Sequence, residues 1–129
     1  YQPGFDGEPW IEEAGRRVRL RFNRLGFRGP DRDLAKPAGV RRLAVLGDSF
    51  AVAVAVDERE TMAARLEDQL NRDGESRWQV FNFGVGAYST AQSLLVWRHF
   101  ARQFAPDVVV LAFYNGNDLW DNDARLTNF

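Results

Sequence analysis

Three apolar runs separated by two amphipathic segments constrain the fold of this chain most. The runs cover residues 42–47, 78–83 and 107–113. Leu43–Leu46 and Val108–Phe113 are apolar throughout, which is typical of strands covered on both faces in a parallel sheet. The alternation of strand and helix predicts an α/β fold built on a βαβαβ unit. Right-handed crossovers then place the first strand between the other two, in the order 2-1-3.

The two segments between the runs carry the signals of capped helices. The first begins near Asp57–Thr61 and ends near Gly74, where a glycine can adopt the left-handed cap conformation. The second begins at Ser89, has Gln92 as a capping-box partner and ends before Pro106. The predicted buried faces are Met62, Leu66 and Leu70 in the first helix, and Leu94, Trp97, Ala101 and Phe104 in the second.

Residues 1–40 follow a different pattern and form a predicted N-terminal β extension to the main domain, residues 41–129. Arg17–Phe22 alternates strictly, which predicts a half-buried strand or hairpin. Its apolar face consists of Val18, Leu20 and Phe22, and its polar face of Arg17, Arg19 and Arg21. The arginines could form a phosphate-binding stripe, but a solvated strand face is the favoured interpretation, because no aromatic platform accompanies them.

Composition limits the classes of function. The 129 residues suffice for one domain with a buried core, and the net charge of −1 gives no general attraction to nucleic acid or anionic membrane. Without cysteine, the chain has no disulfide, thiolate metal site or cysteine nucleophile. No apolar stretch reaches the ~20 residues of a membrane span. No signal peptide is visible, and the first residue is Tyr1 rather than Met, which suggests a processed or excised start and leaves the compartment open.

Residues suited to acyl transfer follow all three predicted strands. Ser49 follows the first strand, a loop with Gly84 and Gly86 follows the second, and Asn117 follows the third. Ligands of an open parallel sheet bind beyond the carboxyl ends of its strands. A hydroxyl, a loop rich in backbone N–H groups and a side-chain amide are parts of an acyl-transfer site. The alternatives are an ordinary helix N-cap for Ser49 and a turn-forming cluster for Asn117.

The segment directly after Ser49 gives conflicting signals. Ala51–Val56 alternates like a strand. We predict a short helix and a covering loop instead, because a strand there would have no room to cross over into a parallel sheet.

In these stretches the chain resembles the SGNH, or GDSL-type, hydrolase family. The matching motifs are Leu46–Phe50, Asn82–Thr90 and Gly116–Leu119, in the same order and on consecutive strands, and Asn23–Gly29 is similar to the lead-in segment of bacterial members. The resemblance covers most of the chain. It implies a serine esterase with a three-layer α/β/α, flavodoxin-like fold, of which this chain would be the amino-terminal, incomplete part.

The resemblance also implies the roles of the site residues. Ser49 would be the nucleophile, and its backbone N–H one oxyanion donor. The family's second donor, a glycine five residues after the asparagine, falls on Ala87, with Gly84 close by as the other candidate. An alanine N–H donates equally well unless the position needs a positive φ. The Asn117 amide would be the third donor. The family also often has glycine at the positions of Ala53 and Ala55.

The family's general base, in an Asp-x-x-His motif, has no counterpart in this sequence. The only histidine is His99, which we interpret as a helix-surface residue. A serine without an adjacent base is a poor nucleophile, so this chain alone is expected to be nearly inactive. The implied substrate is an acyl or acetyl ester of a lipid or carbohydrate, with no cofactor and no metal. The carboxylates of Asp118, Asp121 and Asp123 are interpreted as a solvated acidic loop.

Two other functions are compatible with the sequence. One is a non-catalytic module of the same fold that binds an acyl or carbohydrate ligand or a protein partner. The other is a flavodoxin-like nucleotide or receiver domain, which ranks last because the first loop lacks a phosphate-cradling glycine pattern and an acidic pair. We also expect Val108–Phe113 to form an unpaired apolar edge that favours self-association, with Trp97, Phe104 and Phe113 partly uncovered.

Overall fold

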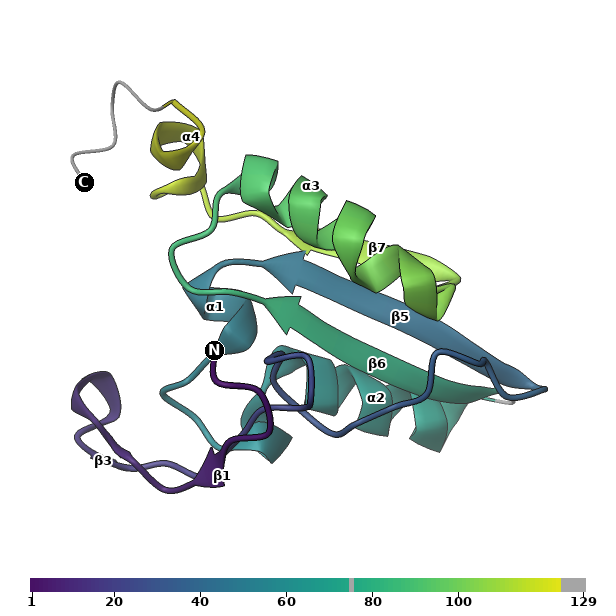
Figure 1. Ribbon diagram of the computed structural model, residues 1–129. Coiled ribbons are helices and arrows are strands. Elements are labelled where there is room, and N and C mark those ends of the chain that lie inside the picture. The colour runs from purple at the N-terminus through teal and green to yellow at the C-terminus, as the bar shows by residue number, and fades with distance from the viewer. Residues whose placement is uncertain (75, 124–129) are drawn as a thin grey trace.

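The computed structural model describes residues 1–74 and 76–123, so residue 75 and the last six residues of the predicted main domain lie outside the described part. Its centre is a parallel sheet of three strands: β5 (Val40–Gly47), β6 (Arg77–Gly84) and β7 (Val108–Ala112). The strand order is β6-β5-β7, with both pairings parallel (Figure 1). The predicted strands, their direction and the central position of the first strand are confirmed.

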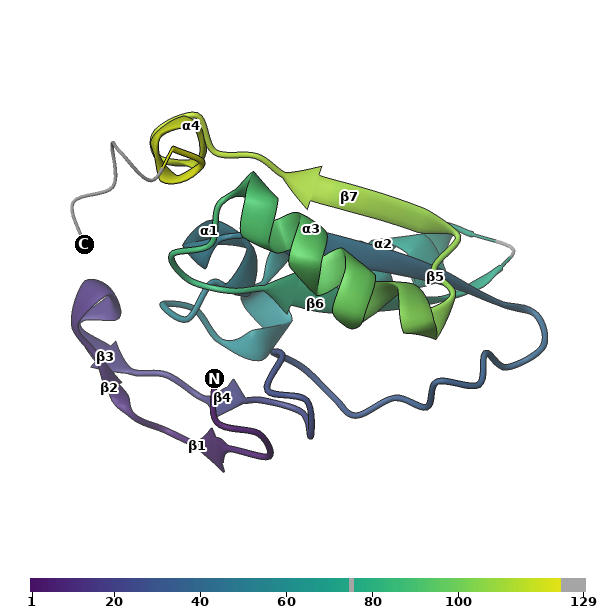
Figure 2. The same ribbon diagram turned by 45° about the horizontal axis from the view of Figure 1, so that its top comes forward.

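Helices cover both faces of this sheet, which makes the protein a layered α/β structure. Helix α2 (Met62–Asp73) packs on one face and α3 (Thr90–His99) on the other (Figures 1 and 2). The core on the α2 side consists of Leu43, Val45, Ala51, Ala63 and Val80. The core on the α3 side consists of Phe27, Ala44, Leu46, Phe81, Phe83, Val96, Ala101 and Phe104. No helix within the described ranges is long and apolar enough to cross a membrane.

Four short helices connect these elements in the described part of the chain. They are α1 (Ser49–Val52), the 3-10 helices η2 (Glu58–Glu60) and η3 (Ala101–Phe104), and α4 (Asp118–Asp121). Of these, α1 and α4 follow strands, η2 precedes α2, and η3 follows α3. Helix α1 confirms the prediction of a short helix and loop after Ser49. Helix α3 begins with the predicted capping box of Ser89 and Gln92.

The predicted left-handed cap at Gly74 is wrong. This glycine has φ −106° and ψ 153°, an extended conformation. Its lack of a side chain serves close packing instead, because a Cβ there would lie 2.6 Å from the carbonyl oxygen of Leu70.

In each of the two predicted helices, one residue assigned to the buried face is exposed. Met62 is 38% exposed, and Ala63 takes its place on the buried face of α2 beside Leu66 and Leu70. Leu94 is 47% exposed, whereas Ser93 and Val96 are buried. The reason in the second case is that α3 ends at His99. The residues that follow belong to the 3-10 helix η3, which has three residues per turn. An apolar stripe spaced for the 3.6 residues per turn of an α-helix therefore does not continue into it.

The N-terminal extension is one long, interrupted hairpin (Figure 2). Strand β1 (Asp6–Gly7) pairs with β4 (Leu20–Arg21), β2 (Trp10–Ile11) pairs with β3 (Arg16–Arg17), and η1 (Glu12–Ala14) forms the tip. The predicted hairpin is present, but Arg17–Phe22 is not one continuous strand. The ladder is interrupted opposite Pro9, which has no N–H to donate, and the Arg19 N–H instead donates to the Asp57 carboxylate over 3.0 Å.

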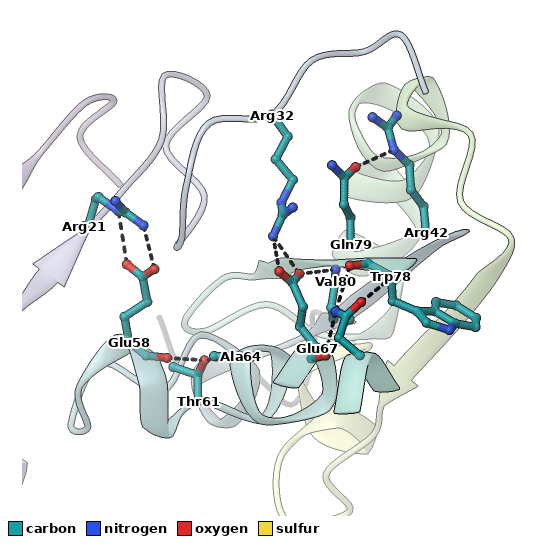
Figure 3. A network of polar contacts seen from close by, with 11 residues as sticks. Arg21, Arg32, Arg42, Glu58, Thr61, Ala64, Glu67, Trp78, Gln79 and Val80 are labelled. Carbon is teal, nitrogen blue, oxygen red and sulfur yellow. Dashed lines mark hydrogen bonds and ion pairs between the residues drawn. The ribbon is translucent and has the colours of Figure 1, made fainter. Parts of the chain in front are cut away.

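The predicted apolar face of this hairpin is correct. Val18, Leu20 and Phe22 are buried and share a small core with Val52 of α1. The arginines on the other face contact acceptors of the same chain. Arg17 donates to the Glu8 carbonyl over 2.9 Å, and Arg19 pairs with the Asp6 carboxylate at 2.7 Å. Arg21 pairs with the Glu58 carboxylate at 2.7 Å, as Figure 3 shows. The extension is thus joined to the main domain by both packing and ion pairs.

Side chains of α2 occupy the outer edge of β6. The Glu67 carboxylate accepts the Val80 N–H and is held by the Arg32 guanidinium at 2.6 Å (Figure 3). The Asn71 amide bonds both the N–H and the carbonyl of Trp78, at 2.8 and 3.0 Å. This edge is therefore protected against pairing with another strand.

The outer edge of β7 has no such cover in the part of the chain described. Strand β7 pairs only with β5 there, and Val109, Leu111 and Phe113 are exposed by 43, 48 and 49%. The expectation that Phe104 would be partly uncovered is wrong, because η3 turns its ring onto Phe81, with ring centroids 4.9 Å apart.

Candidate functional site

The carboxyl ends of the three parallel strands lie at one end of the sheet (Figure 1). The register pairs Gly47 of β5 with Gly84 of β6 and with Ala112 of β7. Helix α1, the loop 85–89 and the loop 113–117 with α4 therefore leave the sheet next to one another. The residues predicted to carry chemistry lie in these three segments, except Gly84, which is the last residue of β6.

Two glycines let α1 sit tightly against the strand ends. A Cβ on Gly84 would lie 2.4 Å from the Val52 nitrogen and 2.7 Å from the Ala51 Cβ. A Cβ on Gly47, whose φ is 153°, would lie 2.9 Å from the Ala112 carbonyl oxygen. Neither position has room for a side chain, so this packing fixes α1, and with it Ser49, relative to the sheet.

Asn82 bridges β6 and α1. Its Nδ2 donates to the Ala51 carbonyl over 2.8 Å, and its Oδ1 accepts the Gly84 N–H over 3.0 Å. The side chain is buried. No separate role was predicted for Asn82. An asparagine inside a strand nevertheless signals a structural contact, because a buried amide needs hydrogen-bond partners.

Ser49 is the first residue of α1 and is exposed. The preceding Asp48 caps the helix: it is buried, and its Oδ1 accepts the Phe50 N–H over 2.9 Å. Asp48 Oδ2 is buried and has no hydrogen-bond partner among residues 1–74 and 76–123. Within the described ranges, no side chain accepts a hydrogen bond from Ser49 Oγ, so no general base contacts it there.

The second loop lies against Ser49 and has one N–H that stays free. A Cβ on Gly86 would be 4.0 Å from the Ser49 Cβ. Four N–H groups in and beside this loop already donate hydrogen bonds. That of Gly84 donates to Asn82 Oδ1, and that of Gly86 donates to the Tyr1 hydroxyl. The N–H of Val85 donates to the Gly47 carbonyl, and that of Tyr88 donates to the Val85 carbonyl. Ala87 is exposed, and its N–H has no partner in the described part of the chain. Of the two predicted donors, Ala87 rather than Gly84 has the available N–H.

Ala87 holds a backbone conformation that normally belongs to glycine. Its φ is 62°, in the left-handed region. This conformation costs a residue with a Cβ about 1–2 kcal/mol. Such strain persists only where the surroundings impose it, and it is concentrated at functional sites. The position of Ala87 therefore requires a positive φ, which glycine would adopt without this cost. Ala53, in the loop after Ser49, is another alanine in the left-handed region, with φ 50°.

Tyr114 connects the first loop to the third. Its ring centroid lies 4.5 Å from that of Phe50. A Cβ on Gly116 would lie 2.5 Å from the same tyrosine ring. The residue after Ser49 and the residue before Asn117 therefore contact one side chain.

Asn117 precedes α4 and is oriented by it. Its Nδ2 donates to the Asp121 carboxylate over 2.9 Å, while its Oδ1 is buried and has no partner among the residues that the structure describes. An amide nitrogen has two N–H groups, so one remains for a further acceptor. The buried Asp118 carboxylate accepts the Tyr114 N–H over 2.6 Å. Convergence of the Asn117 amide with Ser49 stays a prediction.

Asn122 links the third loop to α3 by hydrogen bonds. This contact was not predicted from the sequence. Its Nδ2 donates to Thr90 Oγ1 over 2.6 Å, and its Oδ1 accepts the Ala91 N–H over 3.0 Å. Helix α4 is thereby fixed to the beginning of α3, at the same end of the sheet as α1.

Arg28 holds the loop that follows Ser49. It is 3% exposed, and its guanidinium donates to the carbonyls of Val52, Ala53 and Val56, the first over 3.0 Å. Burial lowers the pKa of Arg28 from its ordinary value. Arg28 is thus a structural support for the loop that follows Ser49.

His99 lies away from this site. It is the exposed last residue of α3, a helix that starts beyond the carboxyl end of β6 and returns toward the start of β7. At 1.5 Å per residue, the ten residues of α3 extend over about 15 Å. His99 therefore lies near the other end of the sheet. This position agrees with the prediction that it is a helix-surface residue.

A recess of about 450 Å³ lies between α2, β6 and the segment 28–32, apart from Ser49. Its lining combines charges of both signs, including Arg28, Arg32, Arg59, Glu58, Glu67 and Asp68. Within the described ranges, no group of three or more histidines, cysteines or carboxylates could hold a metal ion.

Comparison with models of known protein families gave no match, and neither did comparison with curated protein sequences.

Proposed function

We propose that this chain carries the nucleophile and the oxyanion apparatus of a serine ester hydrolase of the SGNH, or GDSL, type, with a flavodoxin-like arrangement of its sheet. The observation that carries the proposal is the pairing of an exposed serine hydroxyl with a free backbone N–H on the adjoining loop. Ser49 supplies the first and Ala87 the second.

In the proposed reaction, Ser49 Oγ attacks the carbonyl carbon of an acyl or acetyl ester of a lipid or carbohydrate. The carbonyl oxygen becomes an oxyanion, the ester alcohol leaves, and water later releases the acid. The N–H groups of Ser49 and Ala87 and the second N–H of Asn117 are suited to stabilise that oxyanion. Removing one such donor typically lowers the rate about 10²–10³-fold.

The proton of Ser49 needs an acceptor, and the described part of the chain places none beside it. A serine hydroxyl without a base is a weak nucleophile at neutral pH. We therefore expect turnover of a nitrophenyl ester by this chain to stay near background. The proposed oxyanion donors beside Ser49 would still assist a slow reaction with a strong electrophile, an assistance that an ordinary exposed serine lacks.

A fluorophosphonate probe followed by intact-mass measurement and peptide mapping tests the proposal. We expect one adduct, located at Ser49, that disappears in Ser49→Ala and persists in the control Ser76→Ala. An unmodified protein, or equal labelling of Ser76, would refute the hydrolase assignment.

A second candidate is a non-catalytic module that binds an acyl or carbohydrate ligand or a protein partner. The specific observation that favours it is that no residue in the described ranges accepts a proton from Ser49. Saturable binding of a short acyl chain or an acetylated sugar by Ser49→Ala, with no labelling of the unaltered chain, would support this function instead.

A further inference from the structure

The phenol of Tyr1 reaches the loop that faces Ser49. Its hydroxyl oxygen accepts the Gly86 N–H over 3.2 Å, across a separation of 85 residues in sequence. A Cβ on Gly86 would lie 2.9 Å from this oxygen and 4.0 Å from the Ser49 Cβ. The Tyr1 hydroxyl and Ser49 thus flank the same glycine.

The N-terminal extension fixes the position of Tyr1. The ring stacks on the buried Phe22, with centroids 4.5 Å apart and an interplanar angle of 13°. The carbonyl oxygen of Tyr1 lies against Gly26, where a Cβ would approach it to 2.6 Å. The Gly4 N–H also donates to the Asn23 carbonyl over 3.0 Å. These contacts hold the phenol where the second loop passes.

The second loop needs such a restraint. Gly86 has wide conformational freedom, and Ala87 beside it holds a strained left-handed φ of 62°. A strained residue keeps its conformation only when neighbouring contacts determine it. On the sheet side the Val85 N–H is fixed to the Gly47 carbonyl over 3.0 Å. The Tyr1 hydroxyl fixes the turn on its other side.

We propose that Tyr1 is a positioning residue of this site: its hydroxyl anchors the Gly86 N–H and thereby sets the turn that presents the Ala87 N–H. This inference rests on the proposed function for its chemical consequence, since the presented N–H is an oxyanion donor only if Ser49 reacts. The anchoring itself is a property of the fold. It gives the extension a direct part in the site, beyond packing.

The test compares Tyr1→Phe with the unaltered chain, with Tyr88→Phe as the matched control. Both variants lose one phenol oxygen, but only the first loses the contact with Gly86. Two quantities are measured: the hydrogen-exchange rate and NMR shift of the Gly86 amide, and the rate of Ser49 labelling by a fluorophosphonate. A neutral hydrogen bond is worth about 1 kcal/mol, so we expect about fivefold faster exchange at Gly86 and similarly slower labelling in Tyr1→Phe.

The outcomes separate the two proposals. Unchanged exchange and shift at Gly86 in Tyr1→Phe would overturn the positioning role. Faster exchange with an unchanged labelling rate would also overturn it, because the contact would then be structural only. Absence of labelling in the unaltered chain, with a Gly86 amide that depends on Tyr1, would refute the hydrolase function and leave the anchoring of the turn established.

Discussion

The buried guanidinium of Arg28 donates a hydrogen bond to the backbone carbonyl of Val52, the last residue of α1, over 3.0 Å. The same side chain bonds the carbonyls of Ala53 and Val56. Ser49 begins the helix that Val52 ends. The segment that closes the N-terminal extension therefore supports the helix that begins with Ser49, and changes in this segment should affect the position of Ser49.

We expect Arg28→Met to destabilise the fold strongly, because three carbonyls lose a charged donor. Hydrogen bonds to charged groups contribute about 1.5–3 kcal/mol each to stability. Because the loop can partly relax around the substitution, we expect the free energy of unfolding to fall by about 2–4 kcal/mol. Urea unfolding measures the change. The control is Arg24→Met, an exposed arginine on the neighbouring turn. Equal, small effects of the two substitutions would contradict the supporting role of Arg28.

We expect Ala87→Gly to stabilise the protein by up to about 1 kcal/mol. Glycine removes the cost of the positive φ, and the larger entropy of the unfolded chain offsets part of this gain. Ala91→Gly in the first turn of α3 is the control, and it should lose up to about 1 kcal/mol because glycine has a lower helix propensity than alanine. Thermal unfolding of both variants gives the comparison. A loss of stability in Ala87→Gly would show that Ala87 is not strained.

Acid should weaken an ion pair at the other end of the sheet. A hydrogen bond from Lys36, 2.6 Å away, and one from the Arg42 N–H lower the pKa of Asp107. Because the folded-state pKa is lower than the unfolded one, this contribution is complete above about pH 4, the ordinary aspartate value. It is lost as pH falls further, through the folded-state pKa.

Urea unfolding between about pH 5 and pH 2 measures this effect around the ordinary aspartate pKa. Asp107→Asn should show a flatter loss of stability on acidification than the unaltered chain. Asp68→Asn, which changes an exposed carboxylate on α2, should keep the original slope. An unchanged slope in Asp107→Asn would mean that Asp107 does not couple folding to acid.

The bare edge of β7 predicts self-association. Unlike β6, whose edge is bonded by Glu67 and Asn71, β7 exposes Val109, Leu111 and Phe113 beside an unpaired edge in the described part of the chain. Charged residues on an edge discourage pairing. Leu111→Lys should therefore shift sedimentation toward monomer, whereas Leu34→Lys, also an exposed leucine, should not. A monomeric unaltered chain at high concentration would exclude this association.

The sheet could be predicted because each strand is a local apolar run that ends in turn residues. The order of the strands followed from the handedness of crossovers. Helix faces were less predictable: the exposure of Leu94 depends on where α3 gives way to η3. That boundary is set by packing rather than by the local pattern.

The supports of the site could not be read from the sequence. The contact of Tyr1 with Gly86 joins residues 85 positions apart, and that of Arg28 with Val52 joins residues 24 apart. Nothing in either local sequence indicates its partner. The chemical groups themselves were predictable, because serine, loop and amide each follow a strand end. The choice of Ala87 over Gly84 needed the full pairing of the N–H groups.

The most direct test of the account is a crystal structure of the chain after phosphonylation of Ser49. We predict that the phosphonyl oxygen lies about 2.7–3.1 Å from the Ala87 nitrogen and from Asn117 Nδ2, the distances of oxyanion donors. Asn117 would keep its contact with Asp121 through its other N–H. An adduct whose oxygen points into solvent, with the Asn117 amide more than about 10 Å away and too far to share the oxyanion, would contradict the account, as would a serine that forms no adduct.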